Sequence, residues 1–230
     1  MKIVAATAFN RLKAHSDLKF SFLDSLEKIP YPIKNHKNQR KNLLIVIGGD
    51  RGLCGGYNNN VRKKTLGYIK DNPDSDIVYI GKKMVIKEHL GLFSDSIQSL
   101  KHWGVLKDKF SGLWGQYSRV DIIYTFFAHI YDQKVIIESI CSNDRKDDSW
   151  EKDFVLDEIN TDIIPILYLA KVMKAIIHAQ LCEFSTRMLT MENASRNADN
   201  MMQDLKLTMN KLRQAAITKE LAETSAGTME

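Results

Sequence analysis

The feature that most limits how this chain can fold is a run of 61 residues, from Ile166 to Ala226, that contains neither glycine nor proline. The run is rich in Ala, Leu, Met, Lys, Gln and Glu, which all favour helix. Pro165 suits the first turn of a helix and Gly227 suits its end, so the sequence predicts one helix over 165–226. Such a helix would be about 90 Å long, more than the width of a domain of this size, so we expect it to protrude.

The second half of this predicted helix carries apolar and small residues at alternating steps of three and four. This heptad spacing predicts a left-handed coiled coil with a partner helix. The residues of this seam are Met191, Ala194, Ala198, Met201, Leu205, Thr208, Leu212 and Ala215.

The N-terminal segment 1–29 is the best candidate for the partner helix. Its first 28 residues contain no Gly or Pro, and Met1, Ala5, Ala8 and Leu12 fall on one helical face. Pro30 and Pro32 then end the helix and open a polar linker. We therefore predict an antiparallel two-helix coiled coil made by the two ends of the chain.

Between residues 43 and 142, short apolar runs alternate with segments of helical length. This alternation predicts a mostly parallel, Rossmann-like α/β domain with right-handed crossovers. The segment 134–140 follows the last strand too closely for a crossover, so it should pair antiparallel as a hairpin. An acidic connecting loop over 143–164 follows, with Trp150 among its charges. The other strands are expected at 43–47, 76–81 and 120–127, and the helices at 58–70, 82–91 and 105–118.

The stretch GGDRGLCGGYNNN, residues 48–60, looks like a phosphate-binding loop but matches neither common template. The Walker pattern requires GK[ST], and Gly55, Gly56 and Tyr57 stand in that place. The glycines also lack the G-x-G-x-x-G spacing, and Asp50 would repel a pyrophosphate. We therefore interpret the loop as a structural turn whose glycines allow positive φ angles and close packing. Asp50 and Arg51 would form a local pair or contact a partner.

No set of residues in the sequence predicts catalysis, a metal site or a cofactor. The three cysteines, Cys54, Cys141 and Cys182, lie far apart, and the six histidines form no cluster. The net charge of +5 arises from a basic N-terminal region, but no aromatic residues alternate with those charges to stack on bases. A nucleotide-binding enzyme and a nucleic-acid-binding coiled-coil protein remain the two alternatives.

The end of the long helix is rich in hydrogen-bonding side chains. Arg213, Gln214 and Thr218 stand at positions i, i+1 and i+5, in the stretch NKLRQAAITKE. On a helix these donors could reach a partner that surrounds it. The smooth QAAI run, 214–217, would offer little obstruction to such a partner.

Several motifs together resemble one family. DRGLCGG (50–56), IGKK (80–83), MENASRNADNMMQDL (191–205) and above all NKLRQAAITKELAE (210–223) closely resemble the gamma subunit of F-type ATP synthases, the central rotor shaft. The resemblance runs from Val4 to the C-terminus. Family members usually have a longer N-terminal helix, so the resemblance implies that Met1 falls inside that helix.

The resemblance implies a non-catalytic rotor subunit that needs no cofactor of its own. The coiled coil would stand in the axis of a ring of three alpha and three beta subunits, and the α/β body would sit on the epsilon subunit and the ring of c subunits. Rotation would then couple proton flow to ATP synthesis or hydrolysis on the beta subunits. The complex would lie at the cytoplasmic face of a bacterial inner membrane, with the matrix side of the mitochondrial inner membrane as the alternative.

The resemblance also implies roles for particular residues. Arg213, Gln214 and Thr218 would hydrogen-bond a loop of the beta subunit, and Trp150 and Phe154 would touch epsilon and the c ring. Membrane association would arise only through the complex, and no nucleic acid would be bound. The loop of the central domain, near the base of the shaft, comprises Asp50, Arg51, Gly52, Leu53, Cys54 and Gly55.

Overall fold

The structure of the 230-residue chain is a computed structural model that describes residues 2–27, 41–86, 89, 91–100, 102–110, 113, 116–141 and 160–227. The chain divides into two compact units, Met1–Met188 and Leu189–Glu230. The elements, in chain order, are α1 (Lys2–Glu27), β1 (Asn42–Ile47), α2 (Tyr57–Asp71), β2 (Asp76–Ile80), β3 (Phe93–Asp95), α3 (Ile97–Leu100), α4 (Trp103–Phe110), β4 (Arg119–His129), β5 (Asp132–Cys141) and α5 (Asn160–Gly227).

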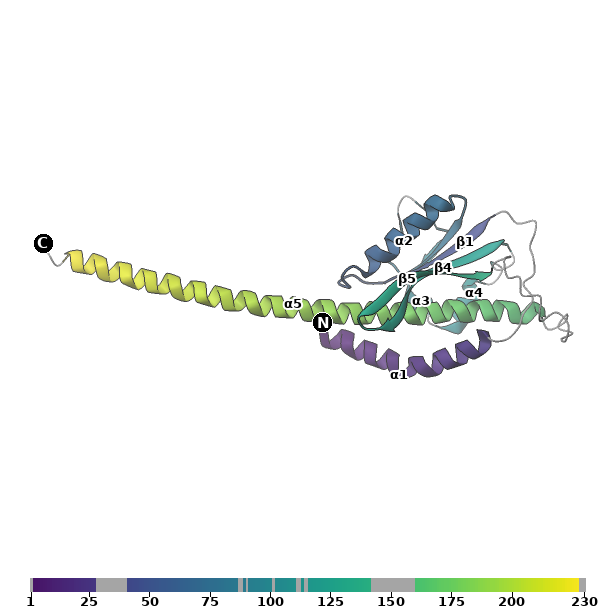
Figure 1. Ribbon diagram of the computed structural model, residues 1–230, viewed down its shortest axis with the longest axis horizontal. Coiled ribbons are helices and arrows are strands. Elements are labelled where there is room, and N and C mark those ends of the chain that lie inside the picture. Colours follow the sequence, from purple (N-terminus) through teal and green to yellow (C-terminus); the bar gives the residue numbers. More distant parts are fainter. Residues whose placement is uncertain are drawn as a thin grey trace. The chain divides into compact units, whose positions relative to one another are not determined.

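The first unit is built on a five-stranded sheet in the order β3-β2-β1-β4-β5 (Figure 1). The first four strands in that order are parallel, and β5 pairs antiparallel with β4. The predicted strands at 43–47, 76–81 and 120–127 and the hairpin at 134–140 are therefore confirmed. The predicted mixed α/β core is confirmed with them.

Strand β1 lies at the centre of the sheet because its side chains are apolar on both faces. Leu43, Ile45 and Ile47 pack with α3, α4 and the first part of α5. Leu44 and Val46 point to the other face and pack with α2. The sheet is thus covered on both sides, α2 lying over one face and α5 over the other (Figure 1).

Two of the predicted helices differ from the structure. No helix forms over the described part of 82–91: residues 82 and 83 make a turn, and Ile86 bridges His89. The chain then forms the short parallel strand β3, which the sequence analysis missed. The other prediction, 105–118, corresponds to the shorter α4, which begins at Trp103 and ends at Phe110.

Helix α5 begins earlier than predicted. It starts at Asn160, so Pro165 is its sixth residue and lies in the second turn, not in the first as predicted. A proline there removes one amide donor from the second turn, next to the turn whose amides lack helical partners anyway. The predicted end at Gly227 agrees with the structure.

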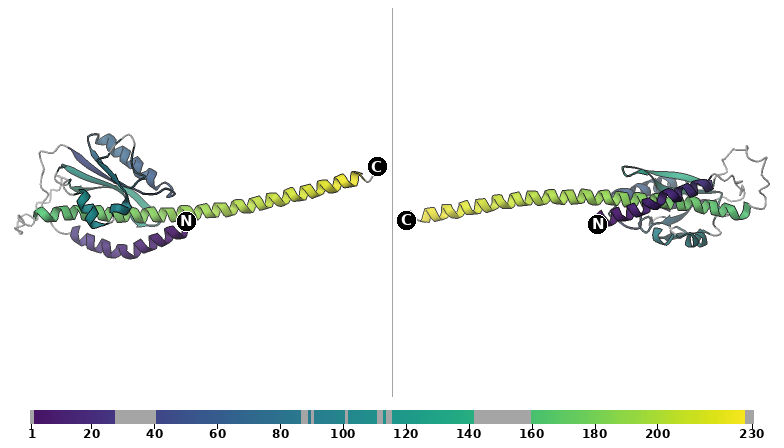
Figure 2. Two further views of the ribbon diagram at one scale, coloured as in Figure 1. Left: turned by 180° about the vertical axis from the view of Figure 1, so that it is seen from behind. Right: turned by 90° about the horizontal axis from the view of Figure 1, so that it is seen from below.

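Helix α1 packs antiparallel against the first part of α5 (Figure 2). Asp24 pairs with Lys174 at 2.7 Å, and the ring of Phe20 stacks on His178 at 4.4 Å between centroids. The pairing therefore runs in opposite directions along the two helices. The apolar contact is made by Phe9 and Leu23 of α1 with Ala170, Ile177 and Leu181 of α5.

The predicted coiled coil along the seam 191–215 is not confirmed. The part of α5 that contacts α1 lies before that seam and includes Ala170, Ile177 and Leu181. In the second unit, the seam residues Met201, Leu205, Thr208, Leu212 and Ala215 are all exposed. Met201 and Leu212 keep 66% and 67% of their surface accessible.

The ends of β1 and β2 approach each other so closely that only glycines fit. The Gly48 amide donates to the Ile80 carbonyl at 2.9 Å, and the Gly81 amide donates to the Asp95 carbonyl at 2.8 Å. Gly81 has φ +114°, and a Cβ on it would lie 2.6 Å from the Gly48 carbonyl oxygen. Position 81 therefore requires glycine for two independent reasons.

We expect Gly81→Ala to lower the free energy of unfolding by about 3 kcal/mol, because the side chain adds both a strained φ and a backbone clash. Urea denaturation of the full chain measures this loss. Gly52→Ala is the matched control: a Cβ there meets nothing within 4 Å, so its cost should stay within about 0.5 kcal/mol. Equal denaturation midpoints for the two variants would show that position 81 does not need glycine.

Candidate functional site

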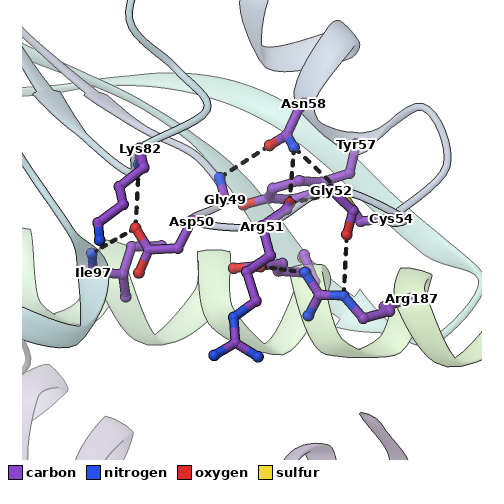
Figure 3. A network of polar contacts seen from close by, with 12 residues as sticks. Gly49, Asp50, Arg51, Gly52, Cys54, Tyr57, Asn58, Lys82, Ile97 and Arg187 are labelled. Carbon is purple, nitrogen blue, oxygen red and sulfur yellow. Dashed lines mark hydrogen bonds and ion pairs between the residues drawn. The ribbon is translucent and has the colours of Figure 1, made fainter. Parts of the chain in front are cut away.

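The glycine loop, residues 48–56, lies between β1 and α2 at the carboxyl ends of the parallel strands (Figure 3). Ligands commonly bind at this edge of an open α/β sheet. Here the Asn58 side chain of α2 hydrogen-bonds two backbone groups of the loop. Its carbonyl oxygen accepts the Gly49 amide at 3.0 Å, and its amide group donates to the Arg51 carbonyl at 3.3 Å. The loop is therefore fixed by the chain's own groups.

Asp50 uses its carboxylate to join three segments of the sheet edge. One oxygen accepts the Lys82 amide at 3.2 Å and the Ile97 amide, at the start of α3, at 3.1 Å (Figure 3). A carboxylate thus occupies backbone donors that a phosphate would otherwise use. This arrangement agrees with the interpretation of the loop as a structural turn and argues against a nucleotide site.

Positive φ angles were predicted for the glycines of the loop, and of these glycines only Gly55 has one, at 54°; a second positive φ, 60°, falls on Leu53, where none was predicted. A leucine in the left-handed region is unusual, and 65% of its surface is exposed. Gly48 and Gly49 serve close packing instead, since a Cβ on either would approach a neighbouring side chain to within 3.0 Å. The role expected of the glycines thus holds for Gly48, Gly49 and Gly55.

Arg187 and Glu183 of α5 connect that helix to the glycine loop. The two side chains form an ion pair at i,i+4 spacing, with only 12% and 6% of their side-chain surface exposed. Arg187 Nε also donates to the Gly52 carbonyl at 3.3 Å (Figure 3). Burial raises the pKa of the Glu183 carboxyl, and the arginine opposes that shift. We call this arrangement the Arg187 contact.

Glu183, Arg187 and Asn58 were not predicted as site residues from the sequence. The i,i+4 spacing of Glu183 and Arg187 on a helix was a usable signal, but it occurs equally at exposed pairs such as Glu192 and Arg196. Only the fold shows which of the two pairs is buried.

Cys54 and Cys182 pack with Tyr57 in one small buried cluster beneath the loop. Burial is the main cause that raises the pKa of both thiols, so neither is a good nucleophile at neutral pH. The Tyr57 hydroxyl donates to the Ala179 carbonyl of α5 at 3.1 Å. The cluster therefore supports the junction of loop and helix. Among the described residues, no group of three or more His, Cys, Asp or Glu could hold a metal ion.

The second unit exposes large apolar side chains on several sides of α5. With about 100° of rotation per residue, these side chains spread over an arc of about 240° around the helix. A two-stranded coiled coil needs only a narrow stripe. The exposed residues are Met201, Met202, Leu205, Leu207, Met209, Leu212, Ile217 and Leu221.

Arg213, Gln214 and Thr218 are exposed on this same part of α5. The Thr218 hydroxyl donates to the Gln214 carbonyl at 2.9 Å within the helix, so its oxygen is presented chiefly as an acceptor. Trp150 and Phe154, expected to contact partners, lie outside the described residues. No helix in the described part of the chain is long and apolar enough to span a bilayer.

The backbone groups of the glycine loop are bonded to side chains of the same α/β body. The long helix carries exposed apolar side chains. Together these two features define a protein that works by contacts with partner chains. The family profile described as "ATP synthase" matches residues 1–229. The chain is 30% identical to the ATP synthase gamma chain of Clostridium beijerinckii, covering 99% of this chain and 89% of that protein. The gamma chain of Ruthia magnifica is also 30% identical, over 93% and 78% of the two chains. The chain belongs to the family of ATP synthase gamma chains.

Solved structures show the same fold. A chain of the Euglena gracilis mitochondrial ATP synthase, in an OSCP, F1 and c-ring assembly, superposes with a TM-score of 0.72 at 18% identity, over 99% of this chain and 86% of that one. A chain of the Tetrahymena thermophila central stalk and c-ring structure gives a TM-score of 0.62, also at 18% identity, over 85% and 97%.

We expect Arg187→Met to lower the free energy of unfolding of the first unit by about 3 kcal/mol at pH 7, because it leaves the buried Glu183 carboxylate without its partner. Arg196→Met, which breaks the exposed pair with Glu192 on the same helix, should cost about 0.5 kcal/mol or less. Chemical denaturation of the full-length variants measures both.

The pH dependence provides a second readout for the same variant. Arg187 opposes the rise in the Glu183 pKa, so its removal raises that pKa further, and as the pH falls the folded variant takes up a proton before the unfolded chain does. The deficit of Arg187→Met relative to wild type should therefore shrink as the pH is lowered from about 7 toward about 5. A deficit that does not change with pH would exclude an ionised Glu183 as its cause.

Proposed function

We propose that this chain is the non-catalytic rotor subunit of an F-type ATP synthase, coupling rotation of the c ring to ATP synthesis or hydrolysis on the beta subunits. One observation carries the proposal: the second unit is a helix with exposed apolar side chains on several sides. Such a helix is normally buried all round. A ring of alpha and beta subunits would supply that surrounding surface.

The contacts of the first unit suit a chain that passes torque. α5 is held there by the sheet, by α1 and by the Arg187 contact, so the helix is fixed on several sides. A twist applied to α5 would be resisted by these contacts together. The exposed part of α5 carries different side chains on its different faces. Each of the three beta subunits would therefore meet a different surface and adopt a different catalytic state.

The remaining partners follow from the family. The α/β body would contact the epsilon subunit and the c ring through the segment 143–164, with Trp150 and Phe154 as contact residues. The chain would be peripheral, held at the cytoplasmic face of a bacterial inner membrane by the complex.

Arg213, Gln214 and Thr218 would hydrogen-bond a loop of the beta subunit. We expect the double variant Arg213→Leu, Gln214→Leu to weaken assembly with alpha and beta subunits at least about tenfold, because the loop loses charge-assisted hydrogen bonds. Thermal unfolding of the first unit should not change. Co-purification and the ATPase activity of the assembled complex measure the effect.

The matched control changes Arg196 and Asn197, an adjacent Arg and amide pair on the same exposed helix, to Leu. It should weaken assembly much less. If the Arg213, Gln214 variant co-purifies and hydrolyses ATP as wild type does, these two residues are not the beta contact.

Leu212 and Leu221 distinguish an encircling partner from a single helix. They are nine residues apart, which places them on opposite sides of the helix, and both are exposed, at 67% and 66%. We expect Leu212→Gln and Leu221→Gln each to weaken assembly about fivefold or more, because each removes apolar burial while glutamine keeps the helix. Pull-down titrations with alpha and beta subunits measure this. Sensitivity at Leu212 alone would indicate one partner helix along the seam.

A further inference from the structure

A cavity of about 490 Å³ lies in the first unit between α1, the β4–β5 turn and α5. Small-molecule sites typically have volumes of about 300–1,000 Å³ and combine apolar walls with a few polar groups. Phe20 and Phe127 supply apolar walls here, and Lys13, His129, Tyr131 and His178 supply polar groups. None of the described residues that line the cavity carries a carboxylate.

His178 lines this cavity with a ring that carries one N–H donor. Its Nδ1 accepts the Phe127 amide at 3.4 Å, so the ring proton is carried by Nε2. The rings of Phe20 and Phe126 pack on it at 4.4 and 4.6 Å between centroids, and His178 also lines the cavity. Burial, assisted by Lys174, lowers the pKa of His178 to about 4, so the ring is neutral at pH 7.

The mouth of the cavity adds further donors. Nδ1 of His129 accepts the Tyr131 and Asp132 amides, both at 3.2 Å, so its Nε2 also carries the proton. The Tyr131 side chain is 82% exposed, which leaves its hydroxyl accessible. Lys13 also lines the cavity, and its ammonium lies 5.9 Å from the Phe9 ring centroid. The N–H and O–H donors therefore favour a ligand with a hydrogen-bond acceptor, and Lys13 favours a ligand with a negative charge.

We propose that this cavity binds a small amphipathic anion, with a flat apolar ring against Phe20 and Phe127 and a carboxylate near Lys13 and the two histidines. The site is distinct from the helix surface proposed for the alpha and beta subunits and does not depend on that assignment. An occupant would touch α1, the β4–β5 turn and α5 at once, and so would strengthen the packing of α1 on α5.

The test uses the isotopically labelled full chain and two probes of the same shape, 2-naphthoate and the neutral 2-naphthamide. We expect naphthoate to shift the amide resonances of Ile130 and Tyr131 in a saturable way. Lys13→Gln should weaken naphthoate binding about fivefold to tenfold and leave naphthamide binding unchanged, because only the anion uses the ammonium. Acetate alone should not saturate.

Two variants act as controls. Lys19→Gln removes the same charge from an exposed position of α1 that does not line the cavity, so naphthoate binding should persist. Ala128→Phe fills the opening and should block both probes, and circular dichroism checks that it folds. Shifts confined to residues 201–221, equal naphthoate affinity in wild type and Lys13→Gln, or an equal loss in Lys19→Gln would each overturn the proposal, as would the absence of saturable shifts.

Discussion

The structure depends on one helix, α5, whose first part is buried and whose second part is exposed. Up to Ser185, most side chains of α5 are buried against the sheet, α1 and the glycine loop, and they complete the core that β1 begins. From Asn193 to Thr224 every side chain is exposed, yet the backbone stays helical. High helix propensity and exposed pairs such as Glu192 with Arg196 support that part locally. One element thus serves as a core helix in the first unit and as a contact surface in the second.

The glycine loop supports the first of these two roles. Asp50 joins the turn after β2 to the start of α3, Asn58 joins the loop to α2, and Arg187 joins it to α5. Asp50 and Asn58 accept backbone amides that a phosphate would need in an enzyme of this fold, and Arg187 donates to a backbone carbonyl of the loop. The same sheet edge that binds ligands in many α/β proteins is therefore used here to hold a helix.

The sequence predicted those features that depend on local pattern. Buried β-branched runs marked β1, β2 and β4, and the absence of Gly and Pro marked α5. It did not predict β3, whose three residues are too few to show a period, or the turn at 82–83, which depends on Gly81 meeting Gly48 across two strands. The position of α1 was also missed, because a heptad spacing does not state how much apolar area each register buries. The Arg187 contact was missed because burial of an i,i+4 pair is a tertiary property.

The exposed apolar residues of the second unit also determine how much stability this helix could gain from partner chains. Eight large apolar side chains there keep between 45% and 70% of their surface exposed in the isolated chain. Burying one such side chain contributes about 1.5–3 kcal/mol, so enclosing the set would contribute on the order of 10 kcal/mol even after losses from ordering. That free energy is available only when partner chains surround the helix. Partner chains that enclose the helix would therefore stabilise the second unit beyond what the isolated chain supplies.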